Sequence, residues 1–209
     1  MLDGYARRLI DPPLALLAAP LARAGVSADA VTMAGLALGL ACAVAVAFSA
    51  TVAALALLAL SRLCDGLDGA VARARGRTDF GGFLDIVCDF AFYGAVPLGF
   101  AVLDAPRNAL AASALLFSFY INGASFLAYA AVAARRGMET RVRGEKSLYF
   151  TAGLAEATET IAAFAAMLLF PAAFPVLAYV FAALCLVTAA SRVVLARARF
   201  AAPPSPQSD

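Results

Sequence analysis

Long apolar runs separated by short polar turns dominate this chain. Each run is long enough to cross a bilayer as a helix that rises 1.5 Å per residue. The pattern predicts six transmembrane helices, over residues of about 30–50, 51–73, 82–103, 109–134, 147–170 and 176–192. The turns that separate them include the polar stretch Asp104–Asn108 and the proline-bounded stretch Pro171–Pro175. We therefore expect an all-α bundle embedded in a membrane.

The N-terminal segment departs from this pattern. Residues 1–24 mix apolar positions with arginines and are interrupted by Pro12, Pro13 and Pro20. The prolines and the lack of a continuous apolar core argue against a spanning helix and against a signal peptide. We expect an amphipathic helix on the cytoplasmic membrane surface, with a partly ordered tail as the alternative. The predicted organisation is this juxtamembrane segment, a six-helix domain over 25–200 and a disordered tail over 201–209.

Composition and charge support the membrane assignment and orient it. The chain of 209 residues is 64% hydrophobic and only 14% charged, which is too apolar for a soluble domain. Its net charge of +2 says little, because the distribution of the charges matters more than their sum. We expect membrane lipids as partners and no nucleic acid. If successive loops are assigned to alternate sides of the membrane, every Lys and Arg except Arg107 lies on the same side or within a helix. The positive-inside rule makes that side cytoplasmic, with both termini cytoplasmic.

Four aspartates interrupt the apolar pattern where charge is costly. Asp65 and Asp68 are three residues apart and Asp85 and Asp89 are four apart, so each pair shares one helical face. If the two helices pack together, cations must neutralise the converging carboxylates. Oxygen ligands and the absence of histidine from the sequence favour Mg²⁺, Mn²⁺ or Ca²⁺. The alternative is pairing with arginines at a helix end: Arg73, Arg75 and Arg77.

The spacing of this stretch resembles the signature of a known family. The fixed positions read Asp65-x2-Asp68-Gly69-x2-Ala72-Arg73-x7-Gly81-x3-Asp85-x3-Asp89. They are similar to those of the CDP-alcohol phosphotransferases, which are integral membrane enzymes of phospholipid synthesis. The resemblance implies that Asp65, Asp68 and Asp85 hold one or two Mg²⁺ or Mn²⁺ ions, and that Asp89 is the catalytic base and a further candidate ligand. It also implies that three residues line the CDP moiety: Gly69, Ala72 and Arg73.

A second, weaker similarity to the family lies near residue 30. Relatives often carry Pro-Asn-x-x-Thr in the region that meets the nucleotide, and here Ala28 and Asp29 stand at the first two positions with Thr32 retained. Thr32 and Asp29 are therefore candidate substrate-binding residues, and the effect of Asp29 on nucleotide recognition stays open. Gly35 and Gly39 form a small-residue pair that favours close helix packing, with a homodimer face as the alternative.

Two further groups are candidates for binding the acceptor. Glu156 and Glu159 lie near the predicted cytoplasmic end of the fifth span, where carboxylates can accept hydrogen bonds from hydroxyl groups. The basic loop before that span carries three cations that suit phosphate: Arg141, Arg143 and Lys146. The alternatives are ion pairing between these groups and the general basic character of cytoplasmic loops.

The resemblance implies transfer of a phosphatidyl group from CDP-diacylglycerol to a small alcohol, with release of CMP. The acceptor stays open among glycerol 3-phosphate, inositol, an inositol phosphate and serine, and a phosphorylated polyol suits the basic loop. The expected location is the bacterial inner membrane, with the site facing the cytoplasm. The competing hypotheses are an ion or proton transporter that uses the intramembrane carboxylates, and a non-catalytic lipid-binding relative.

Overall fold

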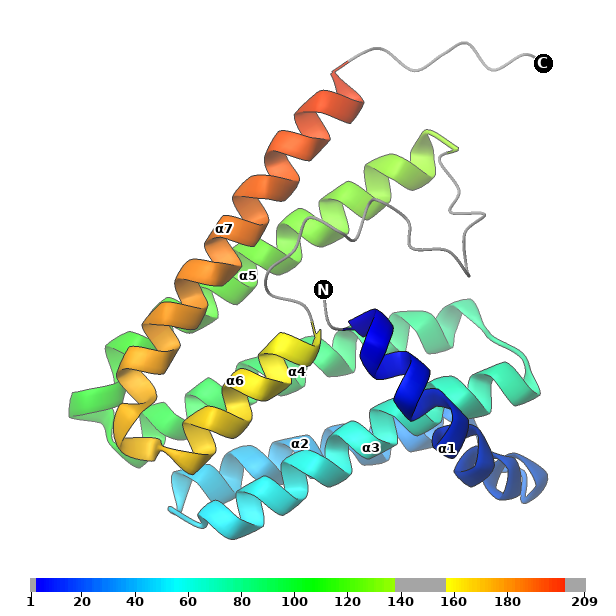
Figure 1. The fold of residues 1–209 in the computed structure, drawn as a ribbon, viewed down its shortest axis with the longest axis horizontal. Coiled ribbons are helices and arrows are strands. Elements are labelled where there is room, and N and C mark those ends of the chain that lie inside the picture. Colours follow the sequence, from blue (N-terminus) through cyan, green and yellow to red (C-terminus); the bar gives the residue numbers. More distant parts are fainter. Residues whose placement is uncertain (1–2, 138–156, 202–209) are drawn as a thin grey trace.

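The computed structural model describes residues 3–137 and 157–201, and within these ranges the chain is helical with no strand. The elements in chain order are α1 (Asp3–Arg23), α2 (Ala28–Ala47), α3 (Thr51–Arg75), α4 (Asp79–Leu103), α5 (Ala105–Arg135), α6 (Ala157–Leu169), the 3₁₀ turn η1 (Pro171–Ala173) and α7 (Phe174–Phe200). Figure 1 shows α2, α3 and α4 packed together, with α5 and α7 diverging from them toward the right and α6 between the two groups. The all-α prediction is confirmed.

The predicted number of six spans is not confirmed. Among the described residues, four segments are long and apolar enough to cross a membrane by length and composition: α2, α4, α5 and the unit formed by η1 and α7. Helix α3 carries the charged residues of the aspartate stretch in its last turns, and α6 has only 13 described residues. The beginning of the predicted fifth span, residues 147–156, lies outside the described residues, as does most of the predicted tail.

Short polar residues begin α2 and α4, whereas α3 begins after Ala50 without a side-chain cap. The Ser27 side chain accepts a hydrogen bond from the Ala30 backbone N–H at 3.2 Å and starts α2. The Thr78 side chain accepts from the Gly81 N–H at 2.9 Å and starts α4. Such caps satisfy backbone donors that the first helical turn leaves without a partner. They fix where α4 begins and therefore the height of Asp85 and Asp89 along it.

The N-terminal segment forms a helix despite its prolines. Helix α1 is one element from Asp3 to Arg23, and its buried side chains Leu14 and Ala18 pack against Ala70 and Val71 of α3. The helical part of the prediction is confirmed, whereas its amphipathic placement on a membrane surface stays a prediction. Packing against α3 brings the segment alongside the helix that carries Asp65 and Asp68.

Antiparallel packing places the helix ends in two groups. Helix α2 packs against both α3 and α4, α4 packs against α5, and α5 packs against α7. The turns at residues 48–50, 104 and 171–173 lie at one end of the bundle (Figure 1, left). The turn at residues 76–78 and the C-terminal ends of α5 and α7 lie toward the other end. The four aspartates lie in the half of α3 and α4 that adjoins the turn at 76–78.

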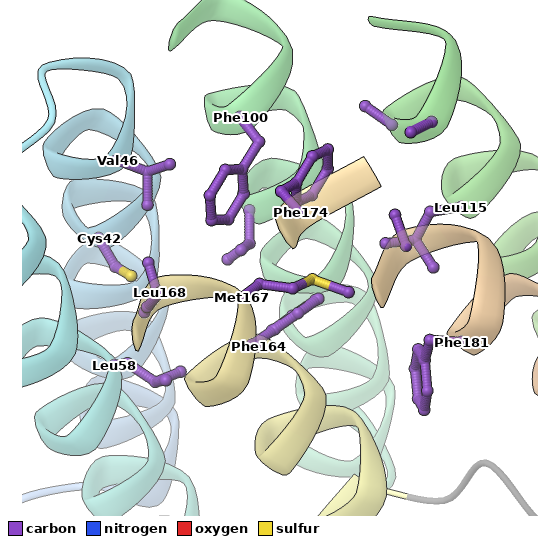
Figure 2. Close-up of a cluster of buried hydrophobic side chains, with 14 of the residues drawn as sticks. Cys42, Val46, Leu58, Phe100, Leu115, Phe164, Met167, Leu168, Phe174 and Phe181 are labelled. Carbon is purple, nitrogen blue, oxygen red and sulfur yellow. The ribbon is translucent and has the colours of Figure 1, made fainter. Parts of the chain in front are cut away.

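Aromatic and aliphatic side chains fill the centre of the bundle. Figure 2 shows the α6 side chains Phe164, Met167 and Leu168 extending between the neighbouring helices, and these residues are at most 2% exposed. Phe100 of α4 stacks on Phe174 of α7 with ring centroids 4.2 Å apart. Within a bilayer, such close contacts stabilise helix association through dispersion rather than through the exclusion of water. The core therefore holds the described part of α6 centrally.

Glycines allow α2 to approach its neighbours closely. A Cβ at Gly39 would lie 2.5 Å from Cδ2 of Phe92 on α4, and a Cβ at Gly35 would lie 3.0 Å from Cβ of Cys64 on α3. Real Cβ atoms do not approach other atoms to 2.5 Å, so a larger side chain at Gly39 would displace Phe92. Both glycines therefore serve packing inside one chain, and this pair lends no support to a homodimer.

Candidate metal centre

Helices α3 and α4 bring three of the predicted aspartates together. Asp65 of α3 and Asp85 and Asp89 of α4 each offer a carboxylate oxygen, and these oxygens all lie within 4.8 Å of one another. The pocket around them is lined by Thr32, Gly35, Leu36, Arg62, Asp65, Asp68, Asp85, Cys88 and Asp89. The predicted convergence of two helical faces is therefore observed, and α2 supplies a third wall.

Asp68 lines the same pocket and is held by α2. It is only 6% exposed, and its Oδ2 accepts a hydrogen bond of 2.6 Å from the Thr32 hydroxyl. The Thr32 hydroxyl also lies 3.1 Å from the Ala28 carbonyl oxygen, one turn earlier in α2. Because hydrogen bonds to a charged oxygen are short and strong, this contact fixes the orientation of the Asp68 carboxylate. Thr32 therefore contacts a predicted metal ligand directly.

Arg62 is a site residue that the sequence analysis did not assign. Its Nη1 lies 3.0 Å from Oδ1 of Asp89 and 3.5 Å from Oδ1 of Asp65, and its side chain is 13% exposed. The signal that could have identified it is a lone arginine within an apolar helix, three residues before Asp65 and therefore on its face. Its guanidinium joins α3 to α4 beneath the carboxylates.

The donor set suits a hard divalent cation. Carboxylate oxygens bind Mg²⁺, Mn²⁺ or Ca²⁺ at about 2.0–2.6 Å, so two ligands on opposite sides of one ion lie roughly 4–5 Å apart. The observed spread of 4.8 Å among the oxygens of Asp65, Asp85 and Asp89 fits this range after small side-chain rotations. Asp68 lies in the same pocket and can join them if its hydrogen bond to Thr32 rearranges.

The remaining signature residues do not line this pocket and lie toward the end of α3 and the start of α4. A Cβ at Gly69 would lie 3.6 Å from Nη1 of Arg73, so the Arg73 guanidinium reaches back beside Gly69. Ala72 is half-buried one turn before the end of α3. On α2, Oδ1 of Asp29 lies 3.2 Å from where a Cβ at Gly81 would stand. A larger residue at position 81 would therefore crowd Asp29 at the start of α4.

The acceptor candidates are described only in part. Glu159 is half-buried in the first turn of α6, next to the buried Thr160. The other four candidates, Glu156, Arg141, Arg143 and Lys146, lie outside the described residues. Asn122 and Ser125 of α5, which are polar positions inside a predicted span, accept hydrogen bonds of 3.0 and 2.6 Å from Arg192 of α7. These bonds connect two helices on the side of the bundle away from α2 and α3.

Comparisons with known proteins agree with the fold and with the aspartate stretch. The sequence model described as CDP-alcohol phosphatidyltransferase matches residues 26–194. The inner membrane protein YnjF of Escherichia coli strain K12 is 45% identical over 193 residues, which cover 92% of this chain and 94% of that protein. The archaetidylinositol phosphate synthase of Methanothermobacter thermautotrophicus is 40% identical over 94 residues, which cover 44% of this chain and 45% of that protein.

Solved structures of one enzyme share this architecture. The phosphatidylinositol phosphate synthase of Mycobacterium tuberculosis with CDP-DAG bound superposes with a TM-score of 0.67 at 24% identity, covering 88% of this chain and 93% of that one. The same enzyme in complex with manganese and citrate gives a TM-score of 0.63 at 26% identity, covering 87% of each chain. The first of these likenesses concerns the fold alone.

The contact between Thr32 and Asp68 generates a prediction about stability. Replacing Thr32→Val keeps the shape of the side chain but leaves the buried Asp68 carboxylate without this donor, which should lower the unfolding free energy in metal-free buffer by about 1.5–3 kcal/mol. Thr32→Ser keeps the hydroxyl and should retain most of the stability. Denaturant titration of both variants in mixed micelles provides the comparison. Equal stability of the Val and Ser variants would show that the bond does not stabilise the protein.

Proposed function

The chain belongs to the CDP-alcohol phosphatidyltransferase family and is an integral membrane enzyme, and from that premise we propose that it transfers the phosphatidyl group of CDP-diacylglycerol to a phosphorylated polyol with release of CMP. The observation that carries the proposal is the convergence of Asp65, Asp85 and Asp89 in one pocket, with Asp68 on its wall. Family membership favours this transfer over the transport hypothesis, because the same four residues complete the family's signature.

The four aspartates have different roles in this proposal. Asp65, Asp68 and Asp85 hold one or two Mg²⁺ or Mn²⁺ ions, and the manganese complex of the mycobacterial enzyme supports this choice of ions. When bound, the cation would offset the charge of the pyrophosphate and of the departing CMP. Asp89 accepts the proton of the acceptor hydroxyl as that oxygen attacks the phosphorus bonded to the diacylglycerol oxygen. Asp89 is also a further candidate ligand.

The last turns of α3 and the start of α2 bind the nucleotide end of the donor in this proposal. Gly69 lets a phosphate approach the α3 backbone, and the Arg73 guanidinium beside it offers donors that match phosphate oxygens. Ala72 lies on the same stretch of α3. Thr32 and Asp29 belong to the nucleotide region of α2, where Asp29 can only accept hydrogen bonds when ionised. The amino group of the cytosine base of the donor would be a suitable hydrogen-bond donor to the Asp29 carboxylate.

The acceptor class follows from the relatives and the basic loop. The archaeal relative and the mycobacterial enzyme are both named for making an inositol phosphate lipid, so an inositol phosphate is the first acceptor to test and glycerol 3-phosphate the second. Arg141, Arg143 and Lys146 would bind its phosphate, and Glu156 and Glu159 its free hydroxyl groups. Inositol and serine lack the phosphate that this basic loop would recognise.

The proposed location is a bacterial inner membrane with the pocket open to the cytoplasm. Five arginines lie at helix ends opposite the turns at 104 and 171–173, near the turn at 76–78 or at the C-terminal end of α5: Arg73, Arg75, Arg77, Arg135 and Arg136. Arg107 lies at the opposite end, where its guanidinium donates to the Ala172 carbonyl. The positive-inside rule then makes the aspartate end cytoplasmic. In this proposal α3 and α6 complete six spans, and α1 lies along the cytoplasmic membrane surface.

The first test is release of CMP by the purified protein. With CDP-diacylglycerol, an inositol phosphate and Mn²⁺ or Mg²⁺, the wild-type protein should release CMP, whereas excess chelator should abolish release and added Mn²⁺ should restore it. Asp68→Asn should lower turnover by at least 10²-fold, because it deletes one carboxylate charge of the pocket. Full turnover in metal-free buffer would refute the metal assignment. If none of the tested acceptors supported release of CMP, the proposed transfer would be refuted.

A second test separates the roles of Asp85 and Asp89. Asp89→Asn should lower turnover by on the order of 10²–10⁴ while leaving Mn²⁺ affinity nearly intact, as expected for loss of a general base. Asp85→Asn should weaken Mn²⁺ binding first. Each change keeps the size of the side chain and most of its hydrogen bonding, so α4 should pack as before. Equal loss of Mn²⁺ affinity in both variants would make Asp89 principally a ligand.

A third test addresses the orientation of the bundle. In a background with Cys64 replaced by Ala, single cysteines at the exposed positions Arg77 and Ala105 mark opposite ends of the bundle. A membrane-impermeant maleimide should label Arg77→Cys only in inside-out vesicles and Ala105→Cys only in intact spheroplasts. The three remaining native cysteines, Cys42, Cys88 and Cys185, are buried and should stay silent. Labelling of Arg77→Cys from outside would invert the proposed topology.

A further inference from the structure

Arg62 lies at the inner end of the aspartate pocket but stands outside the family signature. It precedes Asp65 by one helical turn, on the side of the aspartates away from the turn at 76–78. Its Nη1 contacts Oδ1 of Asp89 at 3.0 Å and Oδ1 of Asp65 at 3.5 Å. One guanidinium therefore contacts two of the three carboxylates whose oxygens converge in the candidate metal group.

Three helices build the slot that holds this guanidinium. Its carbon Cζ lies 4.1 Å from the centroid of the Phe92 ring on α4, and that ring is fully buried against Gly39 of α2. Its Nη2 donates to the Ser61 hydroxyl at 3.2 Å, and that hydroxyl donates to the Gly35 carbonyl of α2 at 2.8 Å. A charged group stacked on a ring and anchored at both terminal nitrogens has little freedom to rotate.

The Arg62 side chain also borders the aspartate pocket directly. Its Nε is buried and has no hydrogen-bond partner among the described residues. Arg62 also counts among the residues that line the pocket with the four aspartates. The positive charge of Arg62 is therefore part of the pocket wall.

We infer that Arg62 is a positioning residue of the transferase, an inference that rests on the proposed function. By binding one carboxylate oxygen of Asp89, Arg62 leaves the other oxygen free to take the proton of the acceptor hydroxyl. By placing a fixed cation at the inner end of the pocket, it confines divalent ions to the end nearer the turn at 76–78. Asp89 is thereby kept available as a base instead of being drawn into the coordination of a metal.

If this inference is correct, removal of Arg62 should change Mn²⁺ affinity and turnover in opposite directions. A fixed cation repels a divalent ion nearby, so its removal should strengthen Mn²⁺ binding. The same removal frees the Asp89 carboxylate to rotate, so turnover should fall. A residue that only supported the fold would instead weaken metal binding and turnover together when it is replaced. The combination of tighter metal binding and slower turnover therefore distinguishes a positioning role from a structural one.

The experiment compares Arg62→Met, Arg62→Lys and the matched control Arg107→Met, which removes an arginine at the other end of the bundle. Mn²⁺ affinity is measured by electron paramagnetic resonance on the purified proteins in micelles without substrate, and kcat and KM are measured with CDP-diacylglycerol. Arg62→Met should bind Mn²⁺ at least threefold more tightly and lose on the order of 10² in kcat, with KM changed by about threefold at most. The control should match the wild-type protein in all three quantities.

Arg62→Lys keeps the charge but loses the planar fork, so its Mn²⁺ affinity should stay close to wild type while kcat falls by on the order of tenfold. This variant decides the matter if Arg62→Met does not fold, because a wild-type kcat for Arg62→Lys would overturn the inference. Weaker Mn²⁺ binding by Arg62→Met would overturn it as well. The metal titration needs no turnover, so the two failures can be told apart: a wild-type protein that released no CMP would refute the proposed function, whereas unchanged or weaker Mn²⁺ binding by Arg62→Met would refute the exclusion of divalent ions by Arg62.

Discussion

Carboxylates inside an apolar bundle must be neutralised, and the architecture of this protein is organised around that requirement. Four aspartates line one pocket between α2, α3 and α4, where repulsion among them would favour separation of the helices. Arg62 contacts two of them, and the Thr32 hydroxyl donates to a third. The close approach of α2 through Gly35 and Gly39 brings these neutralising contacts within reach. Packing and electrostatics are therefore coupled at the same three helices.

The sequence predicted those parts of the fold that depend on periodicity. Spacings of three and four residues placed each aspartate pair on one helical face, and in the structure all four line one pocket, where Asp65, Asp85 and Asp89 converge. The break at Pro171 was also predicted, because proline chemistry acts locally. The number of spans was harder to predict, since α3 mixes apolar residues with the charges of the site.

Contacts between helices distant in sequence escaped prediction. Spacing relates Arg62 to Asp65 on one helix, but nothing in the sequence says that its guanidinium reaches Asp89 and stacks on Phe92. Likewise, Thr32 was noticed through a resemblance at the nucleotide region, whereas its observed partner is Asp68, 36 residues away. Such pairings depend on the rotation of each helix about its axis, which is set by the packing of the whole bundle.

The pairing of Arg62 with Asp89 also constrains how this sequence can diverge. A substitution that removes Asp89 alone leaves a buried guanidinium facing one fewer anion, and a substitution that removes Arg62 alone leaves clustered carboxylates without their internal cation. Either single change is costly, whereas a paired change to apolar residues of similar volume can be neutral for folding. The two positions are therefore epistatic, and descendants that abandon the chemistry should lose both residues together rather than one at a time.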